Sequence, residues 1–354
     1  MPGSTGKAAA PARRVTIKDV ARLAEVSTAV ASRAINGKGD VSEGKRKRAL
    51  EAAAQLGYVP NSMARGLVKG RQTTIGVIVT DSSSPVYASI VRGIEELANE
   101  RGFGVLLANS ADSQAQALRS LDSLIASRVS GVLIVPTQRD RRDIEMLRGA
   151  GMPFVLLLRH FEDDADTDFV ITDNVLGAEQ VTRHLVELGH RRIGHVAGPP
   201  EVSTGQERVT GYRKALEEAG VAPRPELVAH GPYTIEAGQE LGARLLALAE
   251  PPTAIFAATD RQAIGVMQAV RDKGLTVPED VAVVGGDDIE LAQYLAVPLT
   301  TFHQRAREIG REGMQTLLSR MDAIYGDRAG EDAYQQVVLR PELVVRESSG
   351  GRRP

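Results

Sequence analysis

The sequence predicts a small all-α domain at the N-terminus, followed by an α/β body of two subdomains with doubly wound parallel sheets. Three observations lead to this fold class. Residues 15–57 hold short apolar stripes at helical spacing, separated by capping and turn residues. From residue 73 onwards, near-continuous apolar stretches alternate with amphipathic helices in two successive series, which is typical of parallel sheets covered on both faces. A chain of 354 residues is also too long for one ordinary core.

The N-terminal domain begins with two short helices joined by a tight turn. Thr16 can cap the first helix, with Asp19 three residues later as a variant of the capping box. Ser27 can cap the second helix, which ends at Asn36-Gly37. This pair forms a helix-turn-helix, and a third helix follows from about residue 42 to residue 57. The predicted apolar faces consist of Ile17, Val20, Ala21, Leu23 and Ala24, then Val30, Ala31, Ala34 and Ile35, then Ala49, Leu50, Ala53 and Leu56.

Charge is distributed unevenly along the chain, although its formal net charge is only −2. Residues 1–71 contain 14 Lys and Arg against 5 Asp and Glu, whereas the remaining residues contain 29 against 40. A basic head on an acidic body suggests that only the head meets a polyanion. Taken alone, the basic run 45–48 would favour a solvated helix face, but beside a helix-turn-helix it favours DNA.

Composition excludes several classes of protein. The chain has no cysteine, so a disulfide framework, a thiol nucleophile and a cysteine metal cluster are ruled out. The N-terminus lacks the apolar core of a signal peptide, and no apolar run approaches the roughly 18 residues of a membrane span, so we expect a cytoplasmic protein. Dinucleotide, P-loop and zincin motifs are missing, and the six histidines show no metal-ligand spacing. We therefore expect no cofactor, no metal and no enzymatic activity.

Motifs within the first 67 residues resemble the headpiece of LacI-family (lactose- and purine-repressor-like) transcription regulators. The matching residues, in order and spacing, are Val26-Ser27, Ser32-Arg33, Asn36, Val41-Ser42, Leu56-Gly57-Tyr58, Pro60-Asn61, Ala64-Arg65 and Leu67. A lone helix-turn-helix would be a weak signal, whereas this full set is specific. The resemblance implies a ligand-responsive repressor, of carbohydrate-related genes in the leading interpretation, that binds a pseudo-palindromic operator as a homodimer. It also implies a small-molecule effector, with a sugar or sugar derivative favoured.

Residues 15–61 form the predicted DNA-binding headpiece, with its second helix in the major groove. Thr28 and Ala29 lie at the exposed start of that helix, and Arg33 one turn later can make a bidentate contact with guanine. Val30, at a position where the family usually carries Thr, can touch a thymine methyl group. The other predicted DNA-binding residues are Thr16, Ser27, Ser32, Asn36, Asn61, Ala64 and Leu67. For Ser32, a phosphate contact and an ordinary exposed helix position are equally favoured.

Residues 62–72 resemble the family's hinge helix and linker. The resemblance implies that this short helix folds only on DNA, paired with its dimer mate in the minor groove. Leu67 matches an apolar wedge that bends the duplex, and packing of Leu67 on the body is the alternative. Residues 1–14 and 348–354 are predicted to be disordered. The C-terminal tail has no heptad repeat, so we expect a dimer rather than a tetramer.

The body contains two predicted series of strands and helices. The first has strands 75–79, 105–108, 132–135 and 154–158 with helices 86–101 and 113–127. The second has strands 170–172, 193–196, 254–257 and 281–284 with helices 177–188, 207–219, 235–249 and 261–273. The resemblance, which extends to periplasmic sugar-binding proteins, adds crossovers near 172, 302 and 334. It assigns residues 73–171 and 302–333 to an N-terminal subdomain, and 172–301 and 334–347, with a final strand 337–345, to a C-terminal one.

Ligand pockets of open α/β sheets lie beyond the carboxyl ends of the strands. Loops at predicted strand ends supply the candidates Asp112, Arg159, Thr259 and Asp260. The resemblance implies that Tyr87, Thr204, Arg208, Tyr233 and Asp287 line the effector site. Arg208 and Asp287 are expected to face each other across the cleft and to clamp a polar ligand. For Asp112, Thr259 and Asp260, a loop cap or structural ion pair is about as well favoured. Leu157-Leu158 precedes Arg159 where sugar-responsive relatives often carry Val-Asp before the Arg, which weakens the case for a standard hexose.

Other interpretations stay open at this point. The effector could be a nucleobase or nucleoside. A solute-binding protein of a transporter would explain the body, but it needs an export signal and has no use for a helix-turn-helix. A sugar- or nucleotide-processing enzyme would need a catalytic constellation that the sequence does not show.

Overall fold

A computed structural model of the chain describes residues 15–35, 40–58, 73–137, 141–161, 165–325 and 333–350. Its contacts divide the chain into two units, residues 1–72 and residues 73–354. Several predictions lie outside the described residues: the arm 1–14, the segment 62–72, the end of the tail, and the proposed DNA contacts Asn36, Asn61, Ala64 and Leu67.

The first unit contains three helices, α1 Ile17–Leu23, α2 Thr28–Ile35 and α3 Glu43–Gln55. The Asp19 carboxylate accepts hydrogen bonds from the backbone N–H and the hydroxyl of Thr16, at 2.9 and 2.7 Å. Ser27 Oγ accepts a hydrogen bond from the Val30 N–H at 3.3 Å. The predicted capping box of α1 and the predicted cap of α2 are therefore both confirmed. Because the helices meet through alanines, the core is thin, and Leu23 and Leu50 are 44% and 48% exposed rather than buried as predicted.

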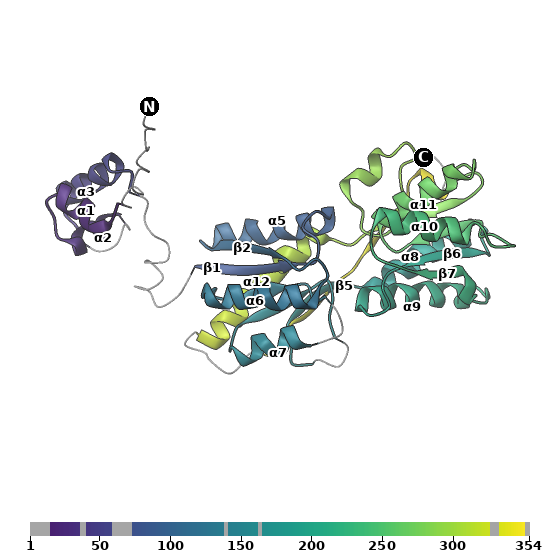
Figure 1. The fold of residues 1–354 in the computed structure, drawn as a ribbon, viewed down its shortest axis with the longest axis horizontal. Helices are drawn as coiled ribbons and strands as arrows, with labels where there is room; N and C mark the ends of the chain where they lie inside the picture. Colours follow the sequence, from purple (N-terminus) through teal and green to yellow (C-terminus); the bar gives the residue numbers. More distant parts are fainter. Residues whose placement is uncertain are drawn as a thin grey trace, which may run out of the picture. The chain divides into compact units, whose positions relative to one another are not determined.

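The second unit contains two α/β subdomains (Figure 1). The first sheet has six parallel strands in the order β11-β5-β4-β3-β1-β2. These strands are β1 Thr74–Val79, β2 Gly104–Asn109, β3 Val132–Ile134, β4 Phe154–Leu157, β5 Phe169–Thr172 and β11 Gln336–Leu339. Helices α5 Pro85–Glu100 and α12 Ala306–Tyr325 share one apolar core with the sheet, and α6 Gln114–Ala126 and α7 Arg142–Gly149 share another.

The second sheet has four parallel strands in the order β7-β6-β8-β9. They are β6 Ile193–Ala197, β7 Val228–His230, β8 Ala254–Ala257 and β9 Ala282–Val284. Helices α8 Asn174–Glu187 and α9 Ser203–Glu218 cover one face, and α10 Ile235–Leu245 and α11 Asp260–Asp272 cover the other, as Figure 1 shows. Short strands β10 Thr301–His303 and β12 Glu342–Val344 pair antiparallel. Single 3-10 turns occupy Pro225–Leu227, Glu290–Tyr294 and Glu347–Ser349.

Strand β5 belongs to the first sheet, where it pairs with β4 and β11, although the apolar pattern placed it at the start of the second series. The expected N-terminal subdomain 73–171 already included most of β5, whereas the expected assignment of all of 334–347 to the C-terminal subdomain is wrong. The predicted strand 337–345 divides at Arg340-Pro341, because proline has no N–H to donate to a ladder. Its first half, β11, pairs with β5, so the last crossover follows Leu339 instead of residue 334. Helices α7 and α12 and strands β7 and β10 were not predicted from the sequence.

The expectation of a disordered tail from residue 348 is wrong for its first two residues. Ser348 and Ser349 are 0% and 2% exposed. The Ser348 hydroxyl donates to the Val283 carbonyl at 2.6 Å and accepts from the Thr300 N–H at 2.8 Å. Small hydroxyl side chains can thus satisfy backbone groups at the buried end of β9, which composition alone did not reveal.

Glycines set the closest helix contacts of the body. A Cβ atom added to Gly310 of α12 would lie 2.0 Å from the carbonyl oxygen of Ile90 in α5, and one added to Gly93 would lie 2.0 Å from that of Arg307. Backbone oxygens cannot move aside as a flexible side chain can. The α5–α12 crossing therefore depends on the absence of a side chain at both positions.

Candidate functional site

The first candidate site is the exposed side of α2. Thr28, Ala29 and Arg33 are exposed there, and Val30 and Ser32 are half-buried. The opposite side is buried through Ala31 and Ala34. Arg33 Nε donates to the Ala29 carbonyl at 3.3 Å, which leaves its terminal amino groups at the surface. The helix thus offers a short polar surface with one cation, as predicted for the reading helix.

The predicted contacts Thr16 and Ser27 are exposed as well, but both hydroxyls already have partners. Thr16 donates to Asp19, and Ser27 accepts from the Val30 N–H. Each oxygen keeps further hydrogen-bonding capacity. A phosphate contact at either position is compatible with the cap.

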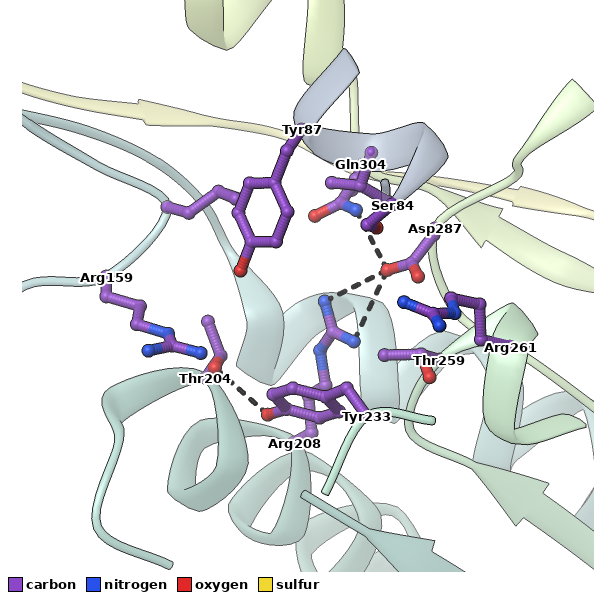
Figure 2. A pocket seen from close by; sticks show the side chains of 12 residues that line it. Ser84, Tyr87, Arg159, Thr204, Arg208, Tyr233, Thr259, Arg261, Asp287 and Gln304 are labelled. Carbon is purple, nitrogen blue, oxygen red and sulfur yellow. Dashed lines mark hydrogen bonds and ion pairs between the residues drawn. The ribbon is translucent and has the colours of Figure 1, made fainter. Parts of the chain in front are cut away.

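The second candidate site is a cleft between the two body subdomains (Figure 2). Its lining comprises Ser84, Val86, Tyr87, Leu158, Arg159, Thr204, Arg208, Tyr233, Thr259, Arg261, Asp287 and Gln304. The loops after β1, β4, β8 and β9, together with the N-terminal parts of helices α5, α9 and α11, supply most of these side chains. This position beyond the carboxyl ends of the strands is where the sequence placed the pocket.

Seven of the nine residues predicted for this site line the cleft, and Asp112 and Asp260 do not. The Asp112 carboxylate accepts a hydrogen bond from Arg159 Nη1 at 2.9 Å. Asp260 is fully buried and accepts from the Ile289 N–H at 2.8 Å and from the Thr301 hydroxyl at 2.6 Å. Both carboxylates support neighbouring segments instead of facing the cavity. Their positions at strand ends could not reveal this, since a side chain there can point inward or outward.

Sequence reasoning missed Arg261 and Gln304. Arg261 directly follows Asp260 at the start of α11. The position after strand β8 was therefore predicted correctly, but Arg261 lines the cavity and the predicted Asp260 does not. Gln304 follows β10, a strand of three residues that the periodicity did not reveal. Ser84, Val86 and Leu158 complete the missed lining residues.

Arg208 and Asp287 form an ion pair, but not across the cleft. Both belong to the second subdomain, with Nη1 and Nη2 of Arg208 each 3.5 Å from Asp287 Oδ1. Arg208 Nε donates to Asn174 Oδ1 at 3.0 Å, and Nη1 donates to the Ala258 carbonyl. Burial raises the pKa of Asp287, and the nearby Asp260 carboxylate adds to the rise, while Arg208 opposes it. The expectation of a clamp across the cleft is therefore wrong.

Arg159 is the cation of the opposite wall. It follows β4 and is 4% exposed, and its Nη1 donates to Asp112 at 2.9 Å and to the Pro136 and Thr137 carbonyls at 2.9 and 3.0 Å. Burial opposes its charge, but the nearby Tyr87 and Asp112 outweigh that effect and raise the pKa of Arg159. The preceding Leu158 has a φ of 64°, a left-handed conformation that a non-glycine residue adopts only at some cost.

Hydroxyl groups complete the cavity. Thr204 Oγ1 and the Tyr233 hydroxyl are 3.0 Å apart, and burial raises the pKa of Tyr233 so that it stays a neutral donor. Figure 2 shows the Tyr87 hydroxyl, Arg159, Thr204, Tyr233 and Arg208 around one common space. This arrangement can recognise a polar molecule by hydrogen bonds, with two aromatic rings as stacking surfaces.

Polar contacts also join the subdomains beside the cleft, and the sequence predicted none of them. Arg261 Nη1 of the second subdomain donates to Asp81 Oδ2 of the first at 2.8 Å. His160 Nε2 of the first lies 2.8 Å from Glu207 Oε1 of the second. Opening of the cleft must break or stretch both contacts.

The described ranges contain no group of three or more His, Asp or Glu side chains that could hold a metal ion. Within the same ranges, no helix is long and apolar enough to cross a membrane.

Family models match parts of both units of the chain. Residues 16–61 match bacterial regulatory proteins of the lacI family, and residues 182–349 match a periplasmic binding protein-like domain. The HTH-type transcriptional repressor CytR of Escherichia coli strain K12 is 36% identical over 334 residues, 94% of this chain and 96% of that protein. The HTH-type transcriptional repressor PurR of Haemophilus influenzae strain PittEE is 35% identical over 94% of this chain and 98% of its own length.

Solved structures show the same fold over nearly the whole chain. The Lac repressor dimer bound to operator and the anti-inducer ONPF matches with a TM-score of 0.84 and 28% identity, covering 95% of this chain and 99% of that chain. The transcriptional regulator CelR in complex with cellobiose matches with a TM-score of 0.73 and 36% identity, covering 95% and 100%. The predicted fold class is confirmed, and the protein belongs to the LacI family of DNA-binding transcriptional repressors, which are not enzymes.

Proposed function

We propose that this repressor binds a pseudo-palindromic operator as a homodimer, and that a small polar effector in the body cleft controls that binding. One observation carries the proposal. The cavity is lined by charged side chains of both subdomains, on a chain whose head exposes Thr28, Ala29 and Arg33 along one helix. A ligand that contacts both walls will favour the closed arrangement over the open one, and such a difference in affinity is what couples a ligand to a second site.

For the head, we propose that α2 enters the major groove. Arg33 then contacts a guanine, and Thr28, Ala29 and Val30 contact neighbouring bases. Thr16, Ser27, Ser32 and Asn36 are the proposed supporting DNA contacts, and Asn61, Ala64 and Leu67 those of the hinge. Target genes of carbohydrate metabolism are part of the same proposal.

For assembly, we propose that a second copy covers apolar surface on both subdomains. Leu106 and Leu107 are 43% and 48% exposed on β2, an edge strand of the first sheet. Leu291 and Tyr294 are 53% and 70% exposed on the second subdomain. Exposed apolar side chains on an edge strand are otherwise a liability for aggregation. Sedimentation at micromolar concentration should give a dimer, and charged substitutions of Leu107 and Leu291 should give monomers.

For the effector, we propose a sugar or sugar derivative. Relatives support this class, since one solved structure is a CelR–cellobiose complex and a 34% identical protein of Haemophilus influenzae strain Rd is a ribose operon repressor. A nucleobase or nucleoside is the second candidate. The aromatic rings of Tyr87 and Tyr233 beside the cavity favour it, because a planar base can stack on either.

The decisive experiment selects duplexes from a random DNA library with the purified protein. We expect a two-fold symmetric consensus whose affinity falls steeply with salt, because each neutralised phosphate contributes about −0.9 to the log–log slope. Candidate effectors are then added to the complex with the selected duplex. Recovery of unrelated sequences, with the same affinity as random DNA, would refute the proposal.

A further inference from the structure

Arg159 uses only one edge of its guanidinium. All three of its hydrogen bonds leave from Nη1, to Asp112 and to the Pro136 and Thr137 carbonyls. Among the residues that the structure describes, none accepts from its Nε–H or Nη2–H groups, although the side chain is only 4% exposed and lines the cavity. Nε and Nη2 form a fork of parallel donors that matches the two oxygens of a carboxylate or phosphate.

The surroundings of this fork are rich in donors. The hydroxyls of Tyr87, Thr204 and Tyr233 and the Arg208 guanidinium face the same space as Arg159 (Figure 2). The counter-ion Asp112 is not among the residues that line the cavity, and 44% of its side chain is exposed, so solvent screens its charge more than that of the buried Arg159. A molecule that enters beside Arg159 therefore meets mainly donors and net positive charge. It must bring acceptors, and a negative charge would be favoured.

The other end of the cavity has the opposite chemistry. Gln304 is 1% exposed, and its Nε2 donates to Asp287 Oδ1 at 2.8 Å. Its Oε1 is buried without a hydrogen-bond partner among the described residues, and Figure 2 shows this oxygen on the side of Tyr87. Arg208 also contacts Asp287 at Oδ1, and the Asp260 backbone N–H contacts the same carboxylate. An unpaired buried acceptor is costly, so a ligand should supply an O–H or N–H to Gln304 Oε1.

We infer that the effector is a hydroxylated oxyanion, a sugar acid or sugar phosphate rather than a neutral sugar. Its carboxylate or phosphate sits on the Nε and Nη2 groups of Arg159, and its hydroxyls point toward Gln304 and Asp287. Arg159 is the residue that determines this specificity. The inference rests on the proposed function, because it assumes that the cleft is the effector site.

The first test uses inorganic phosphate as the probe. The full-length protein is melted in increasing sodium phosphate, against sodium chloride of equal ionic strength. Phosphate stabilises many proteins without binding, so only a saturable rise in melting temperature that depends on Arg159 counts. We expect that rise in the wild type and in the surface control Arg119→Gln, and its loss in Arg159→Gln. A saturable rise that is equal in wild type and Arg159→Gln, or absent from the wild type, overturns the inference.

Arg159→Lys keeps the test valid if Arg159→Gln does not fold. Lysine retains the charge but lacks the planar fork, so we expect half-saturation at a phosphate concentration roughly tenfold higher. An unchanged half-saturation point would overturn the role of the fork.

The second test compares glucose, glucuronate and glucose 6-phosphate for release of the selected operator. Response to one of the two anions, and not to glucose, supports the inference and tells a carboxylate from a phosphate ligand. A response to glucose alone overturns the inference while the proposed function stands. Failure of the proposed function would look different, since the protein would then show no sequence-selective DNA binding.

Discussion

Acid should destabilise the body of this repressor through one buried histidine. His195 lies on the central strand β6, is 0% exposed, and stacks between Tyr212 and Phe256 with ring centroids 5.0 and 4.5 Å away. Its Nδ1 lies 2.9 Å from the Phe256 carbonyl, so Nδ1 must carry the proton and donate it. Its Nε2 is buried without a hydrogen-bond partner in the described part of the chain. Protonation of Nε2 would place an unsolvated charge in this core.

The size of the effect follows from the two pKa values. Burial lowers the pKa of His195 from 6.5 to about 3 in the folded protein. The folded state therefore keeps His195 neutral, whereas the unfolded chain binds a proton at His195 below pH 6.5. The free energy of unfolding is unaffected by His195 above pH 6.5 and decreases as the pH falls from 6.5 toward 3. At pH 5 the loss is about 2 kcal/mol, because each pH unit below 6.5 contributes about 1.4 kcal/mol until the folded-state pKa is reached.

Urea unfolding at pH 7.5 and at pH 5, followed by far-ultraviolet circular dichroism, measures this loss in the wild type and in His195→Leu. The variant cannot titrate at this position, so its free energy of unfolding should fall by about 2 kcal/mol less than that of the wild type. Other groups titrate in both proteins and cancel in this difference. Equal losses in the two proteins would show that burial does not keep His195 neutral, and the reasoning would be refuted.

Three further predictions concern the DNA contact, the effector response and the helix packing. Arg33→Ala should weaken binding to the selected operator by about 1–3 kcal/mol and relax the preference at one base position, measured by fluorescence anisotropy with substituted duplexes. Asp287→Asn should abolish release of DNA by the effector while operator affinity in its absence stays within about twofold, because the residue lines the body cleft. Gly310→Ala should lower the melting temperature through a loss of about 1–3 kcal/mol, whereas Gly149→Ala, where a Cβ meets nothing within 4 Å, should leave it unchanged.

Local patterns in the sequence were sufficient for the helix-turn-helix, both helix caps, and the alternation of strands and helices in the body. The Thr16–Asp19 cap and the Ser27 cap involve residues three apart, so their spacing alone predicts the hydrogen bonds. Apolar periodicity depends only on neighbouring residues, and it predicted a buried strand at 193–196, where the structure has β6 Ile193–Ala197.

Contacts between distant residues were decided only by the tertiary structure. Strand β11 pairs with β5, whose residues lie 167 positions earlier in the chain, and nothing in the four residues of β11 indicates which sheet it will join. Strand ends indicated which loops surround the cleft, but not that Arg261 faces it while Asp260 turns inward. The free edge of Arg159 likewise exists only because Asp112 and two carbonyl groups converge on the other edge. Such convergence depends on how the backbone packs, and periodicity contains no information about it.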